Sequence, residues 1–317
     1  MRCHTCDTDT DVRTRECPTC RTPVGSPVLH PGARVRPVRS VGRAASVAVA
    51  ATTVFLLFTV AVQPVNALLA GRAADAADGE AFLLSAGLLE LGVALLYQVA
   101  LLVAVVLVIV WTWRARKNLD AFPGAGPTHS AGWAIAGWLV PFVNLVLPHR
   151  VMANIARESL WRLSTPTLVH LWWGSWLLFL FAERFIARST TAEFDALPYP
   201  QTAADFQAYA DHYASNTGAY LVPALFCVAA AASLIVLIHR ISAAQTARIV
   251  RAMPTGPILP GMTVAAPAAP PAQVQASPAS PAPAASPASP APAASPAPAA
   301  PVQAPPEPGG AGGTIGA

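Results

Sequence analysis

The residues best suited to chemistry are four cysteines near the N-terminus, in the pattern C-x2-C-x10-C-x2-C. Two CxxC turns joined by a short hairpin place four thiolates at the corners of a tetrahedron, the arrangement that structural zinc prefers. So short a segment buries too little apolar surface to fold without a metal. The spacing therefore predicts a zinc ribbon over residues 1–22, with a structural zinc ion bound by Cys3, Cys6, Cys17 and Cys20.

Catalysis is not expected at this site. Four protein ligands leave zinc no open position for a substrate. The other interpretation, a redox-active pair of CxxC motifs, lacks the surrounding βαβ pattern of thioredoxin-like proteins. The chain also contains no H-E-x-x-H, no P-loop and no dinucleotide-binding glycine motif, so we expect no enzyme. Zinc ribbons bind nucleic acid, bind protein or close a chain terminus, and the ribbon sequence does not choose among these roles.

The rest of the chain has the composition of an integral membrane protein. Only 11% of its 317 residues are charged and the mean hydropathy is +0.47, whereas soluble domains carry about 25% charged residues. The net charge of +4 lies mostly beside apolar segments, which indicates an orientation signal rather than a nucleic-acid-binding surface.

We predict an all-α membrane domain over residues 44–251. Four segments have the length and apolar character of transmembrane helices, and Trp111 and Trp113 stand where an interfacial aromatic belt would lie. Thr202 and Asp205 resemble a capping box that opens a short helix on the outer surface. The four predicted spans are 44–70, 90–113, 168–186 and 218–239.

The central stretch, 132–163, is predicted to be a Pro-broken re-entrant or interfacial segment. Its apolar part, 132–147, would be about 24 Å long as a straight helix, against a hydrocarbon core of about 30 Å. Pro141 removes a helical hydrogen bond, and Pro148 suits the first turn of a second, cationic amphipathic helix. A complete crossing by 132–147 is the competing topology.

Basic residues favour the re-entrant topology. Eight Lys and Arg precede Ala44, six lie between Arg114 and Pro166, and three follow from Arg240, whereas the outer loops hold two with seven acids. The positive-inside rule then places both termini in the cytoplasm, with the protein in the plasma membrane. We expect lipid headgroup contacts from basic residues of the linker 23–43 and of the inner loops, namely Arg34, Arg36, Arg39, Arg43, Arg114, Arg116, Lys117, Arg150 and Arg157.

Three blocks of sequence resemble one bacterial family. They are WTWRARKNLDAF (111–122), SAGWAIAGWLVPFVNLVLPHRVMANI (130–155) and LWWGSWLL (171–178). They are similar to the integral membrane family called domain of unknown function 4328, and the similarity covers about residues 44–251. The resemblance implies a membrane protein, often with an N-terminal zinc ribbon or a Pro-rich terminus, and it implies no activity.

Polar residues within the apolar segments are candidate functional positions. Glu90 and Glu183 both fall near outer ends of predicted spans, where either could pair with Arg184 or Arg72 or serve as an access site for a cation or proton. Asn144 follows Pro141 by three residues, so its side chain could bond the carbonyl that Pro141 leaves free, or it could line a polar cavity.

The C-terminal segment 252–317 is predicted to be a disordered, proline-rich tail. The sequence SPASPAPAA occurs at 277–285 and repeats at 286–294, and such chain has nothing to bury. It is either a solvated spacer or a ligand for a proline-recognising module.

We therefore expect a non-enzymatic membrane module that presents its ribbon and tail to a cytoplasmic protein partner. The alternative is a small channel or transporter built around Pro141 and Asn144. Membrane lipids are the other expected partners, nothing points to nucleic acid, and the oligomeric state is left open.

Overall fold

The computed structural model describes residues 1–11, 13–76 and 78–253. From Arg39 on, the described residues form helices joined by loops. Before Arg39, the backbone pairings Arg2–Asp9 and Glu16–Pro23 are isolated β-bridges. The predicted tail, 252–317, lies outside the described residues except for Ala252 and Met253. The helices are α1 (Arg39–Ala73), α2 (Gly79–Leu119), α3 (Trp133–Leu139), η1 (Val143–Leu145), α4 (Leu147–Leu160), α5 (Thr167–Asp195) and α6 (Ala203–Arg251).

The all-α membrane class is confirmed. By length and composition, α1, α2 and α6 can each cross a bilayer. α5 is 29 residues long and is less apolar, because its first half is rich in tryptophan and its second half carries Glu183, Arg184 and Arg188. The crossing of the membrane by α5, and the limits of each span, stay predictions.

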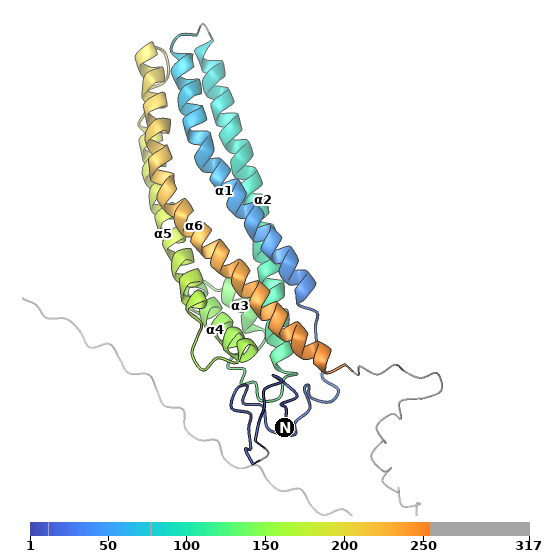
Figure 1. The fold of residues 1–317 in the computed structure, drawn as a ribbon. Helices are drawn as coiled ribbons and strands as arrows, with labels where there is room; N and C mark the ends of the chain where they lie inside the picture. Colours follow the sequence, from blue (N-terminus) through green and yellow to red (C-terminus); the bar gives the residue numbers. More distant parts are fainter. Residues whose placement is uncertain (12, 77, 254–317) are drawn as a thin grey trace, which may run out of the picture. The chain divides into compact units, whose positions relative to one another are not determined.

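The four long helices pack in a defined order. α1 packs against α2 on one side and α6 on the other, and α6 in turn packs against α5 (Figure 1). Along its apolar stretch α2 is mostly exposed, as a helix facing lipid would be. The main core lies at the end of the helices nearest the N-terminal segment, where its largest fully buried side chains include Trp111, Phe122, Met152, Ile155 and Leu237.

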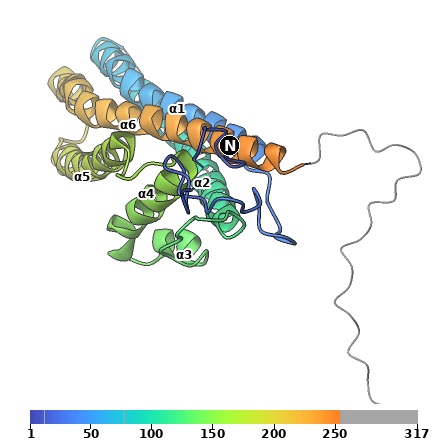
Figure 2. The same ribbon diagram turned by 60° about the horizontal axis from the view of Figure 1, so that its bottom comes forward.

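The central stretch is broken as predicted. Seven residues of α3 span only about 10 Å, and the helix ends at Val140, which is extended with ψ 119° because it precedes Pro141. Phe142 has a positive φ of 62°, and the chain restarts through η1 into α4, which has Pro148 in its first turn. Figure 2 shows α4 beside α3 and α5 at this end of the bundle.

The amphipathic face of α4 is covered by protein rather than by lipid. Val151, Met152 and Ile155 are each at most 2% exposed and belong to the main core. Asn154, which the sequence pattern assigns to the polar side, is also buried. α4 is therefore a packed element of the bundle and not a helix that lies free on the membrane surface.

The capping box at the start of α6 is confirmed, but the short helix predicted after it is wrong. The backbone N–H of Asp205 donates to Thr202 Oγ1 and that of Thr202 donates to Asp205 Oδ2. The helix continues without a break through Pro223 to Arg251. The helical spacing of Phe206 and Tyr213 predicts an aromatic face on the outer membrane surface, but both side chains are buried in the protein.

Candidate functional site

The four cysteines lie on two turns of the same construction. In the first turn Asp7 N–H donates to the carbonyl oxygen of Cys3, and in the second Arg21 N–H donates to that of Cys17. Asp7 and Arg21 both have positive φ, 62° and 57°. A threonine follows each of them, and its Oγ1 accepts a hydrogen bond from the second cysteine, at 3.3 Å in both turns. The chain thus repeats a Cys-x-x-Cys-x-Thr turn. The threonine of this repeat is visible in the sequence, but the spacing of the cysteines alone does not indicate its role.

The four sulfurs gather as a metal site requires. All four Sγ atoms lie within 4.8 Å of one another, and the pairs Cys3–Cys20 and Cys6–Cys17 are each 3.5 Å apart. Four ligands at about 2.3 Å from a tetrahedral zinc ion would be separated by about 3.8 Å. Cys17 and Cys20 are buried, whereas Cys3 and Cys6 are half-buried. The residues therefore fit a four-thiolate metal ion.

The thiols differ in how readily they ionise. Burial opposes ionisation of Cys17, but hydrogen bonds from the backbone N–H groups of Cys20 and Thr19 outweigh it and lower the pKa of Cys17 to about 6. Burial raises the pKa of Cys20 to about 12, with Thr22 acting against the rise. Burial also raises the pKa of Cys6. Of these three thiols, Cys17 is therefore the one whose surroundings favour the thiolate form.

The segment that carries the cysteines is bonded to the helical domain. We call residues 1–22 the head. Thr22 Oγ1 donates to the carbonyl oxygen of Pro123 at 3.5 Å, and, just beyond the head, the N–H of His30 donates to that of Ala121 at 2.9 Å. Gly124 has φ +79°, and a Cβ there would lie 3.0 Å from the carbonyl oxygen of Arg21. The loop after α2 is thus shaped to receive the head.

Two buried side-chain amides, on α2 and α6, form a hydrogen-bond network at the same end of the helices. Asn118 is fully buried; its Nδ2 donates to Gln245 Oε1 and to the carbonyl oxygen of Arg36, and its Oδ1 accepts from Arg36 N–H. Gln245 Nε2 donates in turn to the carbonyl oxygen of Ala115 and to Ser159 Oγ. Two side chains therefore connect the linker, α2, α4 and α6 in one satisfied network.

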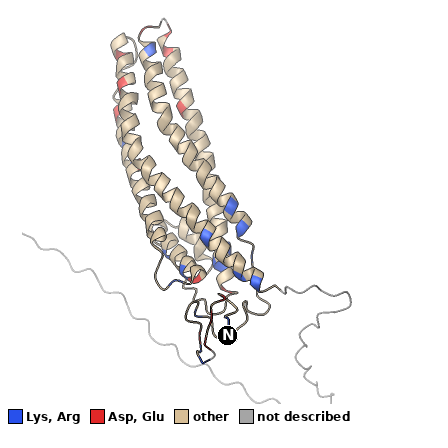
Figure 3. Ribbon diagram, in the orientation of Figure 1, with Lys and Arg blue, Asp and Glu red and all other residues tan. Residues whose placement is uncertain are grey.

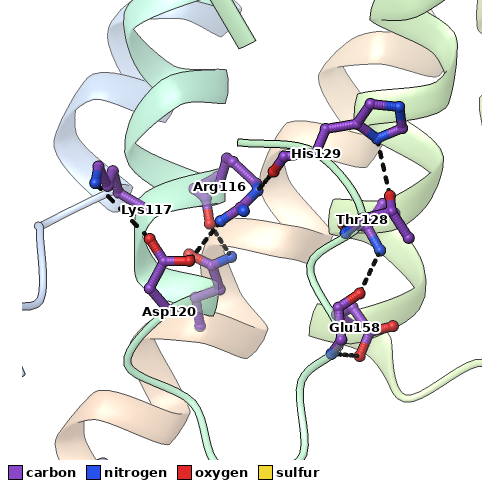
Figure 4. A network of polar contacts seen from close by, with 10 residues as sticks. Arg116, Lys117, Asp120, Thr128, His129 and Glu158 are labelled. Atoms are coloured by element: carbon purple, nitrogen blue, oxygen red, sulfur yellow. Dashed lines mark hydrogen bonds and ion pairs between the residues drawn. The ribbon is translucent and has the colours of Figure 1, made fainter. Parts of the chain in front are cut away.

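A second polar network holds the loop between α2 and α3 (Figure 4). Arg116 Nη1 pairs with Asp120 Oδ1 at 2.7 Å and its Nε donates to the carbonyl oxygen of His129 at 2.6 Å. The carboxylate of Glu158 accepts from the N–H of Gly126. Arg116 is 4% exposed, and its guanidinium binds Asp120 and the carbonyl oxygen of His129 inside the protein. The prediction that it contacts lipid headgroups is therefore wrong.

The other predicted headgroup residues are placed differently. Arg34, Arg36, Arg39, Arg43 and Arg150 are exposed, whereas Arg114, Lys117 and Arg157 are half-buried. Arg114 donates to the carbonyl oxygen of Pro37 and Arg157 to Thr165 Oγ1. Trp111, expected in an aromatic belt, is fully buried and donates to Ser242 Oγ.

Most of the polar positions predicted within the membrane lie apart from the head. Pro141 and Asn144 are exposed, and in the described part of the chain the Asn144 side chain makes no hydrogen bond. Glu90 and Glu183 are half-buried and line the same cavity. Arg72 and Arg184 are exposed, and among the described residues neither forms an ion pair with either carboxylate. Gln63 Nε2 donates to Glu90 instead, at 3.3 Å.

One family model matches the chain. Its description is Domain of unknown function (DUF4328), and it matches residues 69–243. The matched segment runs from the end of α1 into α6, and therefore includes the broken central stretch but not the head. No curated protein and no solved structure matches the chain.

Proposed function

Because the chain belongs to the DUF4328 family, whose description assigns no activity, we propose its role from its own site. The protein is a non-enzymatic, multi-pass module of the plasma membrane. Its zinc-bound head lies on the cytoplasmic side and offers a surface to a protein partner.

The observation that carries this proposal is the joining of the four-thiol head to the basic end of the helices. Lys and Arg residues cluster where α1 begins and where α2 and α6 end, whereas acids predominate at the opposite end (Figure 3). The positive-inside rule assigns the basic end to the cytoplasm. The head is bonded to that end through Pro123, and the segment that follows it is bonded through Ala121, so we place the head on the same side of the membrane.

Zinc is the metal that suits this site. Four thiolates in a tetrahedral arrangement select zinc or an iron–sulfur centre, and a single ion in two short turns is the usual zinc arrangement. The thiol separations of 3.5 Å suit one ion. The zinc would cross-link the two turns, and its removal would loosen the second turn, whose Thr22 contacts Pro123.

The non-enzymatic assignment rests on the closure of this site. Cys3, Cys6, Cys17 and Cys20 would take all four positions of a tetrahedral ion, which would leave none for a substrate or an activated water. The transport alternative was placed at Pro141 and Asn144. Both lie on the exposed surface and neither lines a described cavity, so this position finds no support.

Co-purification from native membranes tests the proposal. Full-length wild type and Cys17→Ser are each crosslinked in cells and purified from the membrane fraction, and Cys227→Ala serves as control because Cys227 lies outside the head. The proposal expects one protein to be recovered with wild type and with Cys227→Ala, and to be lost with Cys17→Ser. Recovery of the same partner with Cys17→Ser contradicts a role for the head.

A further inference from the structure

A cavity with two carboxylates in its wall lies between the long helices, away from the head. Its volume is about 190 Å³ and its wall includes residues of α1, α2, α5 and α6. Glu90 and Glu183 are the charged residues of that wall, and Gln63, Tyr97, Gln98 and Tyr220 are among its polar residues. Glu90 lies 11 residues after the start of α2 at Gly79, so the cavity belongs to the half of the helices opposite the head.

Gln63 has a hydrogen-bond acceptor without a donor. The residue is 3% exposed, and its Nε2 donates to Glu90 Oε1. An ionised carboxylate only accepts hydrogen bonds, so the amide must turn its NH₂ toward Glu90 and keep its oxygen away from it. That oxygen, Oε1, is buried without a hydrogen-bond partner among the described residues. A buried carbonyl of this kind requires a donor.

The remaining groups of the wall do not supply one, since neither the Tyr97 hydroxyl nor the Gln98 amide forms a hydrogen bond with Gln63 Oε1 among the described residues. Thr59 donates to the carbonyl oxygen of Leu56 in its own helix, and the Tyr220 hydroxyl is shared with Thr190. The two carboxylates have no Lys or Arg beside them in the cavity wall. The negative charge of the wall is therefore unmatched by a basic side chain, and carboxylates within a membrane require a cationic or hydrogen-bonding partner.

We propose that this cavity binds a small organic cation with N–H donors, a protonated primary amine. Its ammonium group would donate to the carboxylates of Glu90 and Glu183 and to the unpaired Gln63 Oε1. Its carbon body would pack on apolar wall residues such as Leu56, Val62 and Val93, and the rings of Tyr97 and Tyr220 suit a cation.

The size of the cavity favours an organic ligand over a bare metal ion. An apolar cavity of about 150 Å³ accommodates benzene, and this one is larger. A single inorganic cation would leave most of the volume to be filled by water. An amine with a short alkyl chain occupies the volume and satisfies the three acceptors together.

Ligand binding to the full-length protein tests the proposal. The protein is placed in nanodiscs of phosphatidylcholine, which carries no net charge, and titrated with n-butylammonium, 1-butanol or sodium ions. We expect saturable binding of n-butylammonium that neither 1-butanol nor an equal concentration of sodium displaces. Equal binding of 1-butanol would mean a merely apolar cavity, and displacement by sodium would mean an inorganic cation site. Each of these results, like the absence of butylammonium binding, would overturn the proposal.

Two matched substitutions then locate the site. Glu90→Gln and Glu183→Gln keep side-chain size and remove charge, and each should weaken butylammonium binding by about tenfold or more. Asp78→Asn removes a charge from the exposed residue at the start of α2, outside the cavity, and should leave binding unchanged. Unaltered binding by both glutamine variants would place the amine elsewhere and refute the site. A thermal unfolding midpoint in detergent close to that of the wild type verifies that each variant is folded.

Discussion

Arg248 Nη2 donates a hydrogen bond to the carbonyl oxygen of Pro123, 2.8 Å away. Its Nε reaches the carbonyl oxygen of Val28 at 3.4 Å, and the guanidinium lies over the Phe122 ring, 4.3 Å from its centre. One side chain near the end of α6 therefore holds both the loop that receives the head and the chain that follows the head.

Replacing Arg248 should loosen this end of the protein. Arg248 is 3% exposed, and hydrogen bonds to a buried charged group contribute about 1.5–3 kcal/mol each. We expect Arg248→Met to lower the free energy of unfolding by about 2 kcal/mol or more and to speed proteolysis within residues 1–22. Arg251→Met is the matched control, because Arg251 is exposed and bonds only a carbonyl of its own helix. Equal proteolysis of both variants would contradict the role of Arg248.

Metal affinity of the head should rise with pH. The pKa of Cys17 is about 6, so this thiol is mostly ionised at neutral pH, whereas the pKa of Cys20 is about 12 and its thiol keeps its proton. Metal binding must displace that proton, so affinity falls as pH falls, and falls more steeply once Cys17 is also protonated, below about pH 6. Competition with a chromophoric chelator between about pH 8 and pH 5.5 measures this. An affinity independent of pH would contradict thiolate ligation.

The Asn118–Gln245 network should be costly to break. Gln245 is 1% exposed and makes three side-chain hydrogen bonds to partners on α2 and α4. Gln245→Leu leaves Asn118 and Ser159 without that partner, and should destabilise the protein by about 2–4 kcal/mol. Gln207→Leu is the control, since Gln207 is exposed on the same helix and bonds only Asp211. Thermal unfolding in detergent compares the two, and similar midpoints would refute this contribution.

The cysteine site was predictable from sequence, whereas the network behind it was not. Each CxxC turn is local, so the spacing of Cys3, Cys6, Cys17 and Cys20 is enough to foresee their meeting. Asn118 and Gln245 are 127 residues apart, and no local pattern connects them. Arg116 resembles a headgroup anchor because it follows an apolar run, and only its tertiary partner His129 and nearby Asp120 show that it is buried.

Some features of the fold could likewise be predicted from the sequence, and others could not. Pro141 and Pro148 have local effects on the backbone, which is why the break between α3 and α4 could be foreseen. The continuity of α6 through Pro223 could not, because it depends on packing against α1 and α5. Glu90 and Glu183 were expected at a similar depth, but only the structure places them around one cavity.

The contact between α4 and α5 should weaken in acid. His149 Nε2 and His170 Nδ1 are 3.1 Å apart, and burial, followed by His170 and Arg150, lowers the pKa of His149. The folded protein therefore binds a proton at His149 less readily than the unfolded chain, which takes one up below about pH 6.5. Stability should therefore fall as pH drops below that value, and fall less in His149→Gln. His30→Gln, at an exposed position, is the control; an unchanged pH profile in His149→Gln would contradict the assignment.

The most direct test of the account is the side of the membrane on which each end of α5 lies. Leu163, just before α5, is 85% exposed and Tyr199, just after it, is 71% exposed. Each is replaced by cysteine and the full-length protein is treated in intact cells with a membrane-impermeant maleimide. We expect labelling of Tyr199→Cys, and none of Leu163→Cys until the cells are opened. Labelling of Leu163→Cys from outside would place the basic end, and with it the four-cysteine head, on the wrong side of the membrane.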